Sequence, residues 1–294
     1  MFGLHISKTD KLISKTFKTY DLAIKNAMAE YNITVAQIFT HGPQTPNKNN
    51  VAIEATIPLY AHSCYIAVGV WSNMDKWKFL IKSELEAANS IGALGLVVHL
   101  GPAAPEEIAR ISRAMLQEFK FPIPIILETP AKKPGINHYS YPKPLTQLCN
   151  LLPKELPWGI CVDTAHLWAS GISVSSYSDM TAWLHAAPSD RILLIHLNAN
   201  LSKNFGTGKD LHIIPFTDED GIWMKCCGPS LRKSYNGKSI IWSSVSETDR
   251  KLLYDSGFAA LVQFAKKNNI PCVGEVNRGS KEEVLFYKSV FDSL

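Results

Sequence analysis

The sequence predicts a closed barrel of eight parallel strands alternating with helices, an α/β fold of the (β/α)8 or TIM-barrel type. The chain has 294 residues, of which 46% are hydrophobic, and this is enough to build one large core. Eight short apolar runs bounded by breaker residues recur along it, and helical patterns separate most of them. Because strands that alternate with helices pair in parallel, eight such units in a chain of this length are expected to close into a barrel.

The eight runs are too short for helices and are rich in Ile, Val and Leu, which is typical of buried strands. In chain order they cover 2–6, 35–39, 57–62, 94–99, 123–128, 159–163, 191–196 and 270–275. Helical patterns cover 10–31, 73–91, 104–119, 175–186 and 250–268. We therefore expect one domain over residues 1–294, with a hairpin-bearing insertion at about 225–247 after the seventh strand.

Composition limits the classes of protein that this chain can represent. No apolar run reaches the roughly 18 residues of a membrane helix, and the polar N-terminus does not resemble a signal peptide. The six cysteines form no C-x-x-C pair, which favours a reducing, cytoplasmic compartment without disulfides. The net charge of +4 permits binding to a polyanion without requiring it.

Residues able to bind a metal stand at the ends of six consecutive predicted strands: His62, His99, Glu128, Asp163, His196 and Glu275. The functional site of such a barrel lies where the strands end. Unpaired charges are costly there, and three converging carboxylates repel one another unless cations sit among them. The strand ends therefore predict a ring of metal ligands.

The stretch GICVDTAHLWASG, residues 159–171, has two interpretations. Asp163 is either the N-cap of a helix whose first turn contains His166, or a ligand that faces a metal together with His166. The other strand ends favour the ligand interpretation. Asp210 and His212, in a D-x-H pattern within a later loop, extend the set to nine residues, which exceeds the three or four ligands that a single zinc typically takes. The set suits a cluster of two or three ions.

With these motifs in place, the sequence resembles the endonuclease IV family of apurinic/apyrimidinic (AP) endonucleases along nearly its whole length. The segments that carry the resemblance are GLHIS, AHSCY, VVHLG, ILETP, GICVDTAHLWASG, IHLNAN and KDLH. The likeness is greatest to the compact versions carried by large cytoplasmic DNA viruses, through DTAHLWASGISVSSYSD and GTGKDLHIIPF…DGIW. A viral source would place the protein in the host cytoplasm or the virion.

The resemblance implies a TIM barrel with three zinc ions per chain. One ion would be held by His62, His99 and Glu128. A second would be held by Glu128 as a bridge, with Asp163, His196 and Glu275, and the third by His166, Asp210 and His212. The implied reaction is hydrolysis of the phosphodiester 5′ to an abasic site in duplex DNA, leaving a 3′-hydroxyl and a 5′-deoxyribose phosphate. Glu128, Asp163 and Glu275 would be the catalytic carboxylates, with no nucleotide cofactor, no membrane partner and a monomeric chain.

Contacts to DNA are expected from residues around the barrel mouth. Tyr65 matches a family position that enters the minor groove, and its alternative role is to fill the barrel rim. Gln44 stands where the family carries a wedge arginine, and Lys203, Lys209 and Arg278 are candidates for phosphate contacts. Two further departures from the family pattern, Ala199 and Leu211, remove no metal ligand. His5 is expected near the metals or the substrate, whereas other histidines are expected in surface or capping roles: His41, His138 and His185.

Two other functions remain open on the sequence. A sugar isomerase or epimerase of the same barrel superfamily would share Glu128, Asp163, His196 and Glu275, which form a single-metal set. It would not need the five remaining ligands. A non-catalytic binding protein would keep the metals for structure, but structural zinc sites are typically mononuclear and closed.

Overall fold

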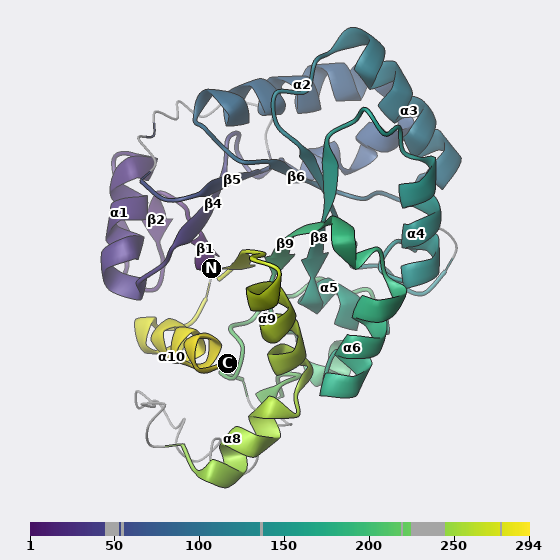
Figure 1. The fold of residues 1–294 in the computed structure, drawn as a ribbon. Coiled ribbons are helices and arrows are strands. Elements are labelled where there is room, and N and C mark those ends of the chain that lie inside the picture. The colour runs from purple at the N-terminus through teal and green to yellow at the C-terminus, as the bar shows by residue number, and fades with distance from the viewer. Residues whose placement is uncertain (45–52, 54–55, 136–137, 219, 225–244, 277) are drawn as a thin grey trace.

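A computed structural model describes residues 1–44, 53, 56–135, 138–218, 220–224, 245–276 and 278–294. Figure 1 shows the strands at the centre with helices arranged around them. No helix in these described ranges is long and apolar enough to cross a membrane. The insertion expected at about 225–247 lies largely outside the described residues.

Eight parallel strands close the barrel in the order β1-β10-β9-β8-β7-β6-β5-β4, which confirms the predicted fold class. Their bounds are β1 Phe2–His5, β4 Val35–Phe39, β5 Leu59–His62, β6 Leu96–His99, β7 Ile125–Glu128, β8 Trp158–Asp163, β9 Ile192–His196 and β10 Cys272–Gly274. Each lies within or next to a predicted run, because a run of β-branched and leucine residues between breakers is suited to a strand that is buried on both faces.

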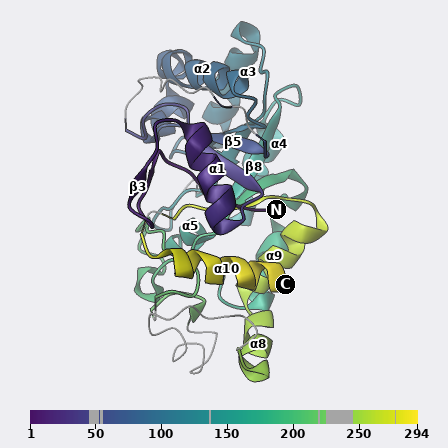
Figure 2. The same cartoon turned by 90° about the vertical axis from the view of Figure 1, so that its left-hand side faces the viewer.

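Helices pack outside the strands: α1 Tyr20–Tyr31, α2 Met74–Ser90, α3 Pro105–Glu118, α4 Pro142–Leu151, α6 Tyr177–Ala186, α8 Glu247–Tyr254, α9 Gly257–Lys267 and α10 Lys281–Ser293. A short helix, α5 Thr164–Ala169, follows β8 directly, and 3-10 turns cover Tyr65–Ser72 (η1), Ser189–Arg191 (η2) and Ser202–Asn204 (η3). Figure 2 shows α1 and α10 lying next to each other on one side of the barrel.

The core has two layers. An outer layer fills the space between strands and helices, and a smaller apolar plug fills the barrel interior. The plug consists of one residue from each of seven strands: Val35, Tyr60, Val97, Ile126, Cys161, Leu194 and Val273. At the matching position of β1 stands Gly3, where an added Cβ would come within 2.1 Å of the Val35 carbonyl oxygen. This plug is the floor on which the site is built.

The predicted helix over 10–31 is wrong in its first half. Residues Thr9–Asp10 (β2) and Lys15–Thr16 (β3) form a small antiparallel hairpin instead. The Asp10 side chain accepts a hydrogen bond from the Leu12 backbone N–H, and Ser14 adopts a left-handed conformation, so the chain turns back on itself. The helix begins only after Thr19, whose hydroxyl caps it.

Other helix boundaries also differ from the prediction. The pattern over 250–268 is two helices, because α8 ends at Tyr254 with Asp255 as its C-cap and Ser256 caps the start of α9. Helices α4 and α10 were not predicted, whereas α5 is the short helix that one interpretation of Asp163 implied. α4 begins with Pro142 in its first turn, and α10 begins with a capping box between Ser280 and Glu283.

Candidate metal centre

Polar side chains form a layer directly above the apolar plug. Because alternate residues of a strand share a face, the residue two positions after each plug residue also faces the barrel axis. The six strand-end ligands expected from the sequence all occupy these positions: His62, His99, Glu128, Asp163, His196 and Glu275. The same spacing places Gln37 two residues after Val35. Because side chains alternate along each strand, these positions of neighbouring strands together form a ring of polar groups at the barrel mouth.

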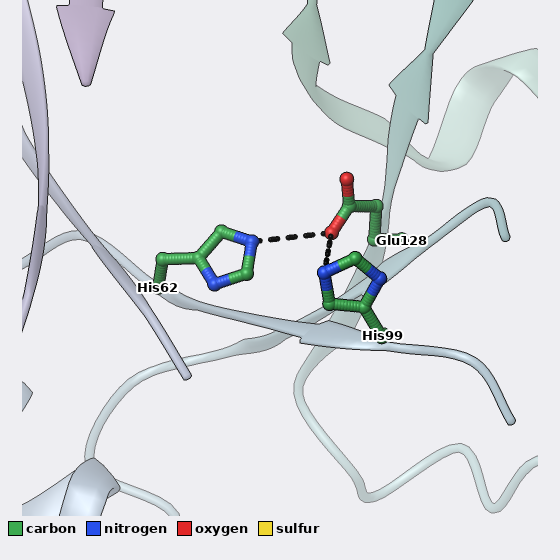
Figure 3. Close-up of side chains that lie close together, drawn as sticks. All are labelled: His62, His99 and Glu128. Atoms are coloured by element: carbon green, nitrogen blue, oxygen red, sulfur yellow. Dashed lines mark hydrogen bonds and ion pairs between the residues drawn. The ribbon is translucent and has the colours of Figure 1, made fainter. Parts of the chain in front are cut away.

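Glu128 lies at the centre of this ring and is fully buried. Its Oε2 is 3.2 Å from His62 Nε2 and 3.2 Å from His99 Nε2, as Figure 3 shows. Its other oxygen, Oε1, is 2.9 Å from His196 Nδ1. The two carboxylate oxygens therefore face different sets of imidazole nitrogens, which is the arrangement that a bridging ligand requires.

Asp163 combines the two roles that the sequence presented as alternatives. Its Oδ1 accepts a hydrogen bond of 2.8 Å from the His166 backbone N–H and so caps α5. Its Oδ2 faces the centre, 3.5 Å from His212 Nε2 and 3.8 Å from His196 Nδ1. Asn198 holds this oxygen in place, because its Nδ2 donates to Asp163 Oδ2 at 2.8 Å. The two interpretations therefore do not exclude each other, because one carboxylate oxygen can cap the helix while the other is free to face a metal.

His166, Asp210 and His212 form the third group. His166 Nε2 and His212 Nε2 are 3.1 Å apart, and Asp210 Oδ1 lies 3.2 Å from the first and 3.0 Å from the second. His166 is oriented by its other ring nitrogen, Nδ1, which lies 2.8 Å from the Thr129 carbonyl oxygen. Three ligand atoms from α5 and from the loop after β9 thus point at one another.

Sets of ligand atoms that all lie within 4.8 Å of one another reproduce much of the grouping implied by the resemblance. One set is His62, His99 and Glu128, and a second is Glu128, Asp163, His196 and Glu275. A third joins Asp163 to His166 and His212, and a fourth consists of His62, His196 and Glu275. These sets contain eight of the nine expected residues, and Asp210 joins them through its contacts with His166 and His212. Asp163 lies between the second and third groups.

The electrostatics show how strongly the site attracts positive charge. Burial lowers the pKa of His62, but the hydrogen bond and charge of Glu128 outweigh burial and raise that pKa to about 9. Burial likewise opposes protonation of His166, but Asp163 and Asp210 raise its pKa to about 10. Burial lowers the pKa of His99 to about 4. Without metal ions, protons on some imidazoles offset the buried carboxylates.

The donor set fits zinc. Two nitrogen ligands of one tetrahedral zinc are about 3.3 Å apart, given bond lengths of about 2.0–2.1 Å. The 3.0–3.2 Å separations among His166, Asp210 and His212 are close to this value. In addition, the buried His99 Nε2 has no hydrogen-bond partner among the described residues, although it lies near Glu128. A buried ring nitrogen in this state is suited to bind a cation.

A cavity of about 500 Å³ opens beside the centre. Tyr65, Gln44, His5, His212 and Glu275 are among its lining residues. Tyr65 has 47% of its surface exposed, and its ring packs edge-on against those of His62 and His99. Tyr65 therefore packs on the barrel rim and is also exposed to solvent. This position is compatible both with filling the rim and with contacting the minor groove of DNA.

The remaining expected DNA contacts lie on exposed loops. Lys203 and Lys209 flank the loop that leads to Asp210, and Arg278 lies between β10 and α10. The loop with the two lysines is anchored, because Gly206 N–H donates to the Trp168 carbonyl and Gly208 N–H to the Ala169 carbonyl.

Three residues differ from expectation or were missed. His41 and His138 are buried, not surface residues: His41 lies beside Thr40 and Ser83, and His138 Nε2 is 2.7 Å from the Lys132 carbonyl oxygen. Gln37 was not predicted as a site residue, although its amide contacts ligands of the centre. Gln37 follows Val35 by two residues and so shares its face of the strand, and this spacing could have identified it from the sequence.

Fold and site together define the class of this protein: a (β/α)8 barrel with candidate polynuclear metal sites at its C-terminal mouth. No protein-family model matches the chain. The resemblance to the endonuclease IV family of AP endonucleases is confirmed by individual relatives. Probable AP endonucleases of African swine fever virus are 27–28% identical over up to 314 residues, covering 97% of this chain and 95% of theirs. A probable endonuclease 4 of Mycobacterium tuberculosis is 26% identical over 72% of this chain and 81% of its own.

Solved structures share the fold of this chain. The structure named AsfvAP:AG is 26% identical with a TM-score of 0.73, covering all of this chain and 97% of that one. Endonuclease IV of Thermus thermophilus shares the fold at 19% identity and a TM-score of 0.65, over 100% of this chain and 99% of its own. A D-allulose 3-epimerase from Methylomonas shares the fold at 12% identity and a TM-score of 0.56, over 99% of this chain and 96% of its own.

Proposed function

We propose that this chain is a zinc-dependent AP endonuclease of base excision repair. It hydrolyses the phosphodiester 5′ to an abasic site in duplex DNA and leaves a 3′-hydroxyl and a 5′-deoxyribose phosphate. The observation that carries the proposal is the convergence of nine ligand residues on one mouth, in a chain similar to viral AP endonucleases over 97% of its length. Three zinc ions per chain are proposed, and the chain is proposed to act as a monomer.

Each ligand group has a distinct task in this proposal. Glu128 would hold two ions, because its oxygens face His62 and His99 on one side and His196 on the other. Asp163 and Glu275 complete the second group, and Asn198 holds them side by side by donating to Asp163 Oδ2 and, at 3.4 Å, to Glu275 Oε2. These three carboxylates would hold the zinc ions in fixed positions, and the phosphate to be cleaved would lie beside those ions.

When bound, zinc would neutralise the phosphate, activate the attacking water and stabilise the leaving 3′-oxygen. The chain itself supplies position and access. Tyr65 and Gln44 line the cavity beside the centre, where an abasic nucleotide would enter. Such a nucleotide has no base to unstack or unpair, so flipping it out of the duplex costs little. Lys203, Lys209 and Arg278 would contact phosphates on either side of the lesion.

The rival function is isomerisation or epimerisation of a sugar at a single metal. Glu128, Asp163, His196 and Glu275 alone would suffice for it, and sugar epimerases share the fold. It leaves the clustering of His166, Asp210 and His212 unexplained. A binding protein with structural metals likewise leaves the open cavity beside the centre unexplained.

The test uses an end-labelled duplex with one tetrahydrofuran abasic analogue, and the same duplex without it as control. We expect a single cut directly 5′ to the analogue, with a 3′ end that a polymerase extends. Glu128→Gln should abolish the cut, whereas Glu86→Gln, on the exposed face of α2, should leave it unchanged. An intact abasic duplex together with epimerisation of a ketose would support the rival instead.

A further inference from the structure

Gln37 on β4 is a fully buried amide in the polar layer of the barrel mouth. Its Oε1 lies 2.8 Å from His196 Nε2. Its Nε2 lies 3.0 Å from Glu275 Oε1 and 2.9 Å from His5 Nδ1. One side chain thus contacts two of the proposed ligands and a third residue that lines the cavity.

The orientation of the Gln37 amide follows from these partners. A carboxylate such as that of Glu275 only accepts hydrogen bonds, so the NH2 group must face it. The carbonyl oxygen must then face His196, because the opposite orientation would set two acceptors against each other at 3.0 Å. The network therefore fixes which end of the amide points where.

This orientation determines the proton positions on His196. Because Gln37 Oε1 can only accept, His196 Nε2 must carry a hydrogen. In the neutral ring the lone pair is then on Nδ1, the nitrogen that lies 2.9 Å from Glu128 Oε1. Gln37 thus directs the metal-binding nitrogen of His196 towards the centre, as a hydrogen-bonding partner behind a ligand histidine commonly does.

The same amide imposes the opposite proton position on His5. His5 Nδ1 also lies 3.5 Å from Glu275 Oε1, but its contact with the Gln37 NH2 group is shorter, at 2.9 Å. Two donors would repel at that distance, so His5 Nδ1 accepts from Gln37 and the hydrogen of the neutral ring is on Nε2. That Nε2 is buried and has no hydrogen-bond partner among the described residues. His5 lines the cavity together with Glu275, His212 and Tyr65. A buried donor without a partner at the wall of a substrate cavity points to a ligand acceptor.

We propose that Gln37 is a positioning residue that holds two histidines in opposite tautomers: His196 as a metal ligand through Nδ1, and His5 as a hydrogen-bond donor to the substrate through Nε2. The acceptor is an oxygen of the abasic nucleotide, either of its phosphate or of its deoxyribose. The substrate half of this inference rests on the proposed function, whereas the tautomers and the metal affinity do not.

The experiment uses zinc-loaded protein with ¹⁵N-labelled histidines, in which long-range ¹H–¹⁵N spectra report the tautomer of each ring. We expect His5 as the Nε2–H form in the wild type. Gln37→Glu places an acceptor opposite His5 Nδ1, so the His5 hydrogen should move to Nδ1 while the acceptor for His196 remains. The new carboxylate also loses the hydrogen bond to Glu275 Oε1 and repels it at 3.0 Å, so zinc affinity and kcat/KM on the abasic duplex should each fall about 10- to 100-fold.

Two further variants separate the two halves of the proposal. Gln37→Leu removes the partner of His196 and should weaken zinc binding about 10- to 100-fold in chelator competition. His5→Phe should keep full zinc and lower kcat/KM on the abasic duplex about 10- to 100-fold, because it removes the proposed substrate contact alone. Gln263→Leu is the matched control, because Gln263 on α9 accepts a hydrogen bond from the Tyr177 hydroxyl on the outside of the barrel and should change neither readout.

Wild-type His5 in the Nδ1–H form, or wild-type zinc affinity in Gln37→Leu, would overturn the role of Gln37. Wild-type kcat/KM in His5→Phe would overturn the substrate contact. A wild-type protein that leaves abasic DNA intact would instead refute the proposed function, and the spectra and zinc affinities would still test Gln37.

Discussion

Replacing Asp163 with asparagine separates the two functions of its carboxylate. Asn caps helices about as well as Asp, so the hydrogen bond from the His166 N–H to Oδ1, 2.8 Å long, should survive with its contribution of about 1 kcal/mol. In the variant an NH2 group replaces Oδ2 and faces Asn198 Nδ2, which is also a donor. The 2.8 Å hydrogen bond from Asn198 Nδ2 to Oδ2 is therefore lost, which should lower the free energy of unfolding by about 1–2 kcal/mol. Burial raises the pKa of Asp163, so burying the charged carboxylate opposes folding of the metal-free protein.

Zinc binding should respond much more strongly. The anionic oxygen that faces His196 and His212 is lost, and an NH2 group cannot bind a metal. Because removing even an outer partner of a ligand costs about 10- to 100-fold in affinity or activity, losing this ligand should cost more than about 100-fold in incision of abasic DNA.

The assay compares three quantities for Asp163→Asn and wild type: zinc per chain, urea unfolding of the metal-free protein, and the incision rate. Asp179→Asn, in the exposed first turn of α6, serves as the control. We expect metal-free stability within about 2 kcal/mol of wild type, with reduced zinc and a collapse of incision. Full zinc and full incision in Asp163→Asn would show that the residue is only a helix cap and would refute the reasoning.

Three further predictions concern the bridge, the pH and the rim. Glu128→Gln should lose zinc from two groups at once, so its zinc per chain should fall further than that of any variant of a residue in one group; wild-type zinc content would contradict the bridge. The pKa of His62 is raised to about 9 in the metal-free protein, so His62 must lose a proton before zinc binds. The apparent zinc affinity should therefore rise with pH up to about pH 9, by about tenfold per pH unit for each proton that zinc displaces. Chelator competition between about pH 6 and about pH 9 measures this, and an affinity independent of pH would contradict it. Tyr65→Ala should lower incision of abasic DNA about tenfold with full zinc retained, whereas Tyr254→Ala, on the exposed face of α8, should not; equal rates would remove Tyr65 from the DNA contacts.

The strands and the residues at their ends could be predicted because both follow from strong local patterns. A buried parallel strand is a short apolar run, and a polar residue directly after it must lie at the mouth of the barrel. His62 and His196 therefore needed no structure to be placed near each other. Asp210 and His212 were harder to place, because only the fold of the loop after β9 brings them to His166.

Other features depend on contacts that a local pattern does not contain. The hairpin at Thr9–Thr16 replaces a predicted helix because Asp10 bonds its own turn and the Tyr31 hydroxyl, 21 residues away. Gln37 lies inside the apolar run 35–39, where a single polar residue resembles an interruption of a strand. Its role emerges only when β9 and β10 bring His196 and Glu275 to it.

The mouth of the barrel is proposed to hold a cluster of zinc ions. The most direct measurement is an anomalous difference map at the zinc absorption edge from crystals of the zinc-loaded protein. We expect three peaks: one beside His62 and His99, one between Glu128 and Glu275, and one beside His212. A single peak within the group of Glu128 and Glu275, or none at the mouth, would contradict the account.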